Sequence, residues 1–130
     1  MSEDTPDIIK IGEEWLEGQR IRHLSRPVTY ARGEGSVDVR ATVGRTVFEV
    51  DDGTGILEQY ESRDFIIRAA DLVIDDVAVS PERGDRIRET QDGIVYVYEV
   101  MAPGRLPHAK FSDRSRRTLR IHTKLVDTEE

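Results

Sequence analysis

Apolar and polar residues alternate along most of this chain from residue 27 onward, and that alternation restricts the fold more than any other feature. In "SVDVRATVG", the residues Val37, Val39, Ala41 and Val43 occupy every second position. Successive side chains of a strand point to opposite faces, so this spacing predicts a strand with one buried face. The run "TVFEV" continues the pattern after Gly44, which we interpret as a bulge or bend.

Turn signals separate further runs of this kind. "DDGTG" (51–55) predicts a loop, and a loop or weak strand is expected to follow through "ILEQYES". Asp92-Gly93 lies between two apolar runs and predicts a hairpin. "APGRLPHAKFSD" contains two prolines and predicts a loop, after which "RRTLRIHTKLV" predicts a closing strand. Six or seven short strands at this spacing predict a mainly β fold, a small antiparallel β-barrel or sandwich.

One helix is expected before the strands. In residues 7–25, the side chains of Ile8, Ile11 and Trp15 recur at helical spacing, which predicts an amphipathic N-terminal α-helix. We therefore divide the chain into an N-terminal tail and helix (1–26), a β domain (27–126) and a frayed acidic C-terminus (127–130).

Composition excludes several classes of protein. The 130-residue chain has a net charge of −7, which argues against nonspecific coating of nucleic acid, because such binding depends on clustered Lys and Arg. It has no cysteine, so neither a disulfide nor a thiolate metal site can form. The start "MSEDTPD" is acidic where a signal peptide needs a basic and then an apolar segment. No apolar run approaches the roughly 20 residues that span a bilayer, so we expect a protein made in a cytoplasm, without membrane contact.

The basic residues are concentrated in one segment. Residues 105–124 contain seven Lys or Arg and one acid, Asp113, which leaves 12 basic and 25 acidic residues elsewhere. Two interpretations stay open: a solvated strand and loop, or a docking surface for an acidic partner such as another copy of the chain. The candidate interface residues are Arg114, Arg116, Arg117, Arg120 and Lys124.

No pattern of catalytic or metal-binding residues is present. His23, His108 and His122 are far apart and fit no metal-binding motif, and neither a phosphate-binding loop nor a nucleophile elbow occurs. Adjacent acids such as those at 51–52 rarely converge on one substrate. The sequence therefore predicts no enzyme, no metal and no cofactor. The remaining alternative is a ligand-binding or catalytic barrel that combines His122 with nearby acids.

The stretch "SPERGDRIRE" contains Arg83-Gly84-Asp85, the tripeptide of integrin-binding adhesion loops. Adhesion would require export and a protruding loop. Pro81 and Gly84 instead fit a turn, within which Asp85 can accept hydrogen bonds from backbone amides. We interpret the stretch as a structural turn that begins a strand at Ile87.

The order of the segments "RPVTYARG", "VRATVGRTVFEV", "RDFIIRAADL", "PERGDRI", "YVYEVM" and "RRTLRIHTK" resembles tailed-bacteriophage head–tail joining proteins, also called head-completion, connector or stopper proteins. The resemblance covers roughly residues 26–124. Its best markers are Pro81 with Gly84-Asp85 before a strand, the "YEV" strand, and a closing strand that ends near Thr123-Lys124.

This resemblance implies a structural protein of the virion neck, assembled in the host cytoplasm. Its copies would form a homo-oligomeric ring between the portal or adaptor and the tail-side terminator, with DNA as transiting cargo in the channel. A loop between early strands would project into that channel and plug it, and the candidate residues are Asp51, Asp52, Gly53, Thr54, Gly55 and Glu58. The alternative is a tail terminator or a tail-tube subunit with a related barrel.

Overall fold

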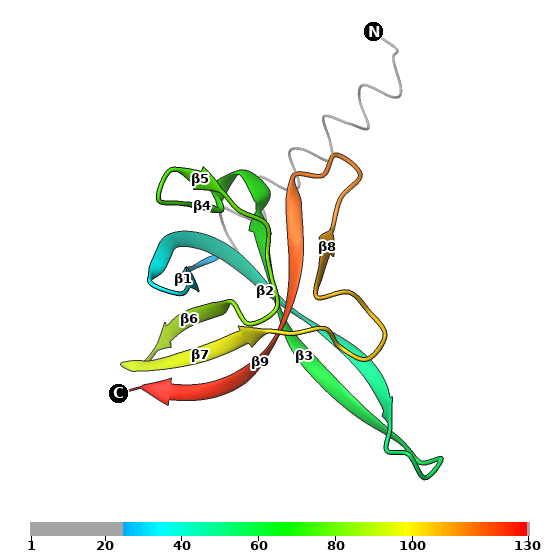
Figure 1. The fold of residues 1–130 in the computed structure, drawn as a ribbon. Helices are drawn as coiled ribbons and strands as arrows, with labels where there is room; N and C mark the ends of the chain where they lie inside the picture. The colour runs from blue at the N-terminus through cyan, green and yellow to red at the C-terminus, as the bar shows by residue number, and fades with distance from the viewer. Residues whose placement is uncertain (1–24, 130) are drawn as a thin grey trace, which may run out of the picture.

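A computed structural model describes residues 25–129 of the chain, and they form a mainly β structure (Figure 1). The helix expected within residues 7–25 lies, apart from Ser25, outside the described residues. The described strands are β1 (Arg26–Arg32), β2 (Gly35–Asp51), β3 (Leu57–Arg68), β4 (Val73–Ile74), β5 (Val77–Ala78), β6 (Arg86–Gln91), β7 (Ile94–Val100), β8 (Ala109–Phe111) and β9 (Thr118–Glu129). A 3-10 turn, η2 (Ala69–Asp71), follows β3.

Seven of these strands form one antiparallel sheet in the order β3-β2-β1-β6-β7-β9-β8. β3 also pairs with β9, from Arg63 opposite Thr123 to Arg68 opposite Thr118. The strands β3-β2-β1-β6-β7-β9 therefore form a closed circuit of hydrogen-bonded neighbours. The short β4–β5 pair makes a separate two-stranded sheet. The expectation of a mainly β fold built from antiparallel strands is confirmed.

The core lies inside this circuit and consists mostly of side chains at alternate positions of its strands, to which Leu72 and Ile74 are added from the segment after η2. Val39 and Ala41 of β2 are buried, as their spacing predicted, and Val37 and Val43 pack against the core at partial exposure. The aromatic ring of Phe65 meets that of Tyr98 edge-on, with centroids 5.4 Å apart. The buried core residues are Val28, Tyr30, Val39, Ala41, Phe65, Ile67, Leu72, Ile74, Ile87, Tyr98, Val100, Leu119 and Ile121.

The hairpin predicted at Asp92-Gly93 is confirmed. Gln91 of β6 lies opposite Ile94 of β7, and the two turn residues have φ values of 52° and 82°. Positive φ at both central positions is the requirement of the two-residue turn that matches strand twist.

Besides β8, which lies within the predicted loop "APGRLPHAKFSD", three segments differ from the sequence-based expectation. "ILEQYES" belongs largely to β3, because its residues pair with β2 over the whole hairpin. Gly44 lies in register opposite Asp64 without a bulge. Residues 127–129, expected to fray, pair with β7 from Val97 to Val95. In each case a distant partner strand supplies the hydrogen bonds, and this pairing outweighs weak local propensity.

Candidate interaction surfaces

β2 and β3 extend beyond the closed circuit as a two-stranded hairpin, which projects from the body in Figure 1. The pairing of β1 with β2 ends at Ala41, and the pairing of β9 with β3 ends at Arg63. Farther out, no other described strand pairs with β2 or β3. We call residues 46–61 the arm. It leaves backbone donors and acceptors exposed along both edges, a feature that favours pairing with another chain.

The tip of the arm is a turn held by its own acidic residues. Asp51 Oδ1 accepts a hydrogen bond from the Gly53 amide at 2.9 Å. Asp52 Oδ1 accepts from the Thr54 amide at 2.8 Å and from the Thr54 hydroxyl at 2.6 Å. These bonds, from the hydroxyl first and then the amide, lower the pKa of Asp52. Gly53 and Gly55 have φ near 90°, a conformation that suits glycine.

The arm is acidic and unusually apolar for an exposed element. It carries five acids and no base: Glu49, Asp51, Asp52, Glu58 and Glu61. Five of the eleven large hydrophobic residues exposed in the described chain also lie here: Val47, Val50, Ile56, Leu57 and Tyr60. Exposed apolar side chains that are concentrated in this way commonly mark a surface that binds another molecule.

The two faces of the arm differ. On one face Phe48 stacks on Tyr60, with ring centroids 6.0 Å apart, and Gly104 of the β7–β8 loop lies against Phe48. On the other face Val47 lies opposite Glu61, and Glu49 lies opposite Gln59. Farther out on that face Asp51 lies opposite Leu57, which is 59% exposed. We call this second face the open face of the arm.

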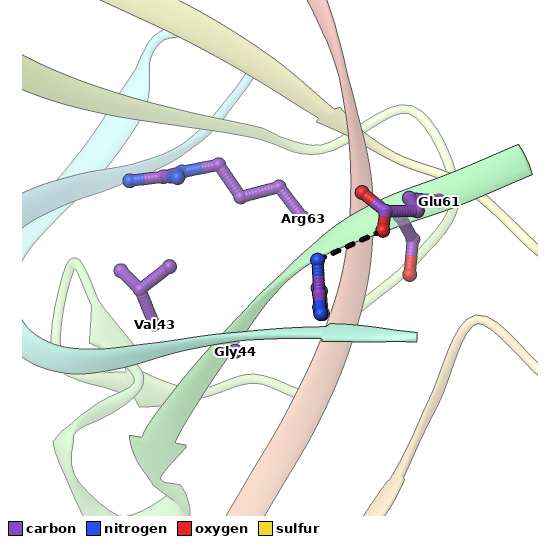
Figure 2. A pocket seen from close by; sticks show the side chains of 6 residues that line it. Val43, Gly44, Glu61 and Arg63 are labelled. Atoms are coloured by element: carbon purple, nitrogen blue, oxygen red, sulfur yellow. Dashed lines mark hydrogen bonds and ion pairs between the residues drawn. The ribbon is translucent and has the colours of Figure 1, made fainter. Parts of the chain in front are cut away.

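A shallow hollow marks the base of the arm, lined by Val43, Gly44, Arg45, Glu61, Ser62 and Arg63. The Arg45 guanidinium pairs with Glu61 at 3.1 Å across its rim, the dashed line in Figure 2. The Arg63 side chain extends away from Glu61 toward the body. The hollow is wide open and holds charges already paired, so it lacks the enclosure of a small-molecule pocket.

A buried carboxylate, Asp64, fixes the arm to the body. Its Oδ1 accepts hydrogen bonds from Ser62 Oγ at 2.6 Å and His122 Nδ1 at 2.8 Å. Its Oδ2 accepts from Thr46 Oγ1 at 2.5 Å and from Arg120 Nη1 at 2.6 Å. Burial by itself would raise the pKa of Asp64, but the bonds from His122, Ser62 and Thr46 outweigh it and lower the pKa to about 2. Asp64 thus ties β2, β3 and β9 together where they diverge.

Gly44 makes room for this arrangement. A Cβ atom at Gly44 would lie 3.3 Å from Arg120 Nη2 and 3.4 Å from Arg120 Nη1. The glycine therefore lets the guanidinium cross β2 and reach Asp64 and the Arg45 carbonyl. The sequence pattern shows the glycine, but only the long-range strand pairing shows which side chain fills the space.

A second carboxylate, that of Glu89 on β6, is also buried and is held by side chains from other strands. It accepts hydrogen bonds from Arg26 at 2.6 Å, Arg63 at 2.8 Å and Gln91 at 2.9 Å. Burial opposes ionisation, yet these bonds prevail and lower the pKa of Glu89. The Arg63 guanidinium also lies over the Tyr98 ring, 5.2 Å from its centroid. Sequence reasoning missed both carboxylates, although Glu89 stands at the inward position two residues after Ile87.

The five residues expected to form one basic interface occupy three different settings. Arg114, Arg116 and Arg117 lie on the exposed loop between β8 and β9, where Arg116 covers the Phe111 ring at 5.0 Å. Arg120 is held by Asp64, with about a quarter of its side chain exposed. Lys124 is exposed on β9, opposite Glu99 of β7. The structure therefore groups the three loop arginines and separates the other two from them.

The comparison with protein families bears directly on this architecture. The family model described as phage head-tail joining protein matches residues 6–130, nearly the whole chain. The chain belongs to this family. A search of curated proteins finds no match. Membership makes it a structural protein of bacteriophages and supports a role in the virion neck, between head and tail.

The remaining candidate sites fit a structural role in this head-tail joining protein. His122, the alternative centre for a ligand site, is 1% exposed, and its Nδ1 is bonded to Asp64. Within residues 25–129, no group of three or more His, Asp or Glu is placed to hold a metal ion. Within the same part of the chain, no helix has the length and apolarity to cross a membrane.

The Arg-Gly-Asp stretch of this family member is a turn whose acid points inward. Asp85 is 4% exposed and accepts hydrogen bonds from Arg32 Nε at 2.9 Å, from the Tyr30 hydroxyl and from the Glu82 amide at 2.9 Å. Burial opposes ionisation, but the bonds from Arg32 and Tyr30 prevail and lower the pKa of Asp85. Gly84 has a φ of 96°. An integrin needs a free carboxylate, and this one is already engaged.

Proposed function

We propose that this protein forms a ring in the phage neck that joins the portal or adaptor to the tail and continues the DNA channel. The observation that carries the proposal is the arm: an acidic, partly apolar hairpin that extends well past the core on a compact body. Family membership supplies the setting, since a head-tail joining protein must contact proteins on both sides.

The circuit of strand pairing supports a barrel rather than a sandwich for the body. In a sandwich, two sheets pack face to face and keep separate edges. Here β3 pairs with both β2 and β9, so the six main strands return to their starting point. Closure of this kind leaves few unpaired strand edges in the body. The unpaired edges lie mainly in the arm and in the part of β9 beyond Thr123, where its pairing with β3 ends.

The tip of the arm is our candidate for the segment that enters the channel. All residues from Asp51 to Tyr60 are exposed, and the tip includes Asp51, Asp52 and Glu58. Carboxylates repel the phosphate backbone, so such a tip can obstruct a channel without binding DNA tightly. The two glycines let the turn remain narrow.

Two measurements test this function. Particles assembled without the chain are expected to give separate heads and tails, visible by electron microscopy. A reconstruction of the intact neck is expected to place a ring of this chain on the head side of the tail terminator. A position at the end of the tail, or repetition along the tube, would contradict the proposal and would support the terminator or tube alternative.

A further inference from the structure

The structure presents two exposed surfaces of opposite charge. One is the open face of the arm, with Glu49, Asp51 and Glu61 around Val47 and Leu57. The other is the segment 110–117, "KFSDRSRR", which we call the basic loop. Its only acid, Asp113, is engaged with the backbone amides of Arg117 and Thr118.

Neither surface neutralises the other inside one molecule. Among the described residues, Glu49 and Asp51 form no ion pair, and neither do Lys110, Arg114 and Arg116. Within residues 25–129, Glu61 pairs only with Arg45, through side chains that are both more than half exposed. In Figure 1 the arm and the β8–β9 loop project from opposite ends of the body, so the arm of a chain does not reach its own basic loop.

Each surface also carries the exposed apolar or aromatic side chains that are typical of the centre of a protein–protein interface. Val47 and Leu57 are more than half exposed on the arm, and Phe111 is 39% exposed on the basic loop with the Arg116 guanidinium over its ring. Protein interfaces commonly combine exposed apolar and aromatic side chains with a charged rim, and arginine is enriched in them.

We propose that the open face of the arm binds the basic loop of a second copy of this chain. The contact joins different surfaces on the two copies, so it can be repeated from copy to copy and closes into a ring when the rotation allows. This inference rests on the proposed ring and identifies the two surfaces that hold neighbouring copies together. Opposite charge sets the register, and apolar contact between Val47, Leu57 and Phe111 excludes water from the centre.

Charge reversal gives a specific test. The arm variant Glu49→Lys/Glu61→Lys and the loop variant Arg114→Glu/Arg116→Glu each place like charges at the contact. We expect either variant to associate at least about tenfold more weakly than the wild type, measured by sedimentation velocity and native mass spectrometry. The control, Glu34→Lys/Glu58→Lys, makes the same change in net charge at exposed positions outside the open face and is expected to associate like the wild type.

Mixing the two variants distinguishes this contact from a general charge effect. The arm variant has a basic open face and a basic loop, whereas the loop variant has an acidic open face and an acidic loop. Neither can bind itself, but an equimolar mixture is expected to form dimers and larger species in which the two alternate. The quadruple variant, with both surfaces reversed, is expected to recover association by itself. Raising the salt from about 0.05 M to about 1 M shortens the screening length from over 10 Å to about 3 Å and should weaken each of these complexes.

Several outcomes would overturn the inference. They are a wild-type chain that stays monomeric at low salt, a mixture that stays as dissociated as its components, or variants that associate as well as the wild type. If instead the loop variant keeps wild-type association and loses binding to a DNA duplex, the basic loop contacts nucleic acid and the inference fails. The neck location is tested separately by the particle reconstruction, so a failure here leaves that proposal standing.

Discussion

At the scale of single residues, the buried carboxylate of Asp64 connects the arm to the body. Asp64 is fully buried and faces two basic side chains, Arg120 and His122. Replacing it with Asn leaves the shape nearly unchanged but removes the charge that compensates Arg120. We expect Asp64→Asn to lower the free energy of unfolding by about 3–5 kcal/mol, because it leaves a poorly compensated cation at a largely buried site. Urea denaturation monitored by circular dichroism measures this loss.

The exposed pair of Arg45 and Glu61 provides the matched control. Arg45→Gln breaks an ion pair of similar length at the surface, where such pairs contribute less than about 1 kcal/mol. If Asp64→Asn were no more destabilising than Arg45→Gln, Asp64 would not be the anchor of the arm.

The same carboxylate predicts how stability depends on pH. The pKa of Asp64 falls from 3.8 to about 2 on folding, and those of Asp85 and Glu89 are also lowered. For each group the unfolded state binds more protons at acidic pH, so stability is fully present above the unfolded pKa and is lost as pH falls toward the folded value. We expect the melting temperature to decrease between about pH 5 and pH 2, with Asp64 alone contributing on the order of 2 kcal/mol. A calorimetric series is the measurement, and Asp64→Asn should show a shallower decrease than the wild type.

At the scale of elements, a glycine determines how the small β4–β5 pair packs on the main sheet. A Cβ atom at Gly35 would lie 2.6 Å from Ile74 Cγ2, a contact too short for carbon atoms, and Ile74 is part of the core. We expect Gly35→Ala to destabilise the fold by about 1–3 kcal/mol, because the buried side chain must move. Thermal unfolding measures the effect. Ser36→Ala, at the exposed neighbouring position, should leave the melting temperature nearly unchanged, and equal effects for the two variants would contradict this account.

The sequence predicts individual elements better than their lengths. Alternation located the strands around Val39 and Val97, and the Asp92-Gly93 hairpin followed from turn chemistry alone. The sequence did not predict that β3 begins at Leu57. Glu58, Gln59 and Glu61 have low strand propensity, and they are extended because they pair with β2. Nor did it separate Arg120 from the loop arginines, since that depends on Asp64, 56 residues away.

At the scale of the whole molecule, the body provides the stable core and the arm provides an exposed surface. The closed circuit of strands contains nearly all buried apolar residues, whereas the arm contributes none of them. The arm can therefore vary in length or charge with little effect on the stability of the body. Such separation suits the proposed role in the neck, in which the bodies would form the ring and the arm would be free to move when DNA passes.

This separation allows a test of the arm tip in the assembled particle. Val50 lies directly opposite Glu58, so replacing residues 51–57 with Asn-Gly closes the hairpin with a two-residue turn. The shortened chain keeps Val47, Glu49 and Glu61 of the proposed contact between copies but loses Asp51 and Leu57, so its association is first checked by sedimentation velocity. We expect it to melt within a few degrees of the wild type, because every removed residue is exposed. Particles that contain it should join heads to tails, yet a larger fraction of their packaged DNA should become sensitive to nuclease, since the channel is less obstructed. A wild-type level of protected DNA would remove the tip as the plug, and heads without tails would show instead that the tip helps to bind the tail.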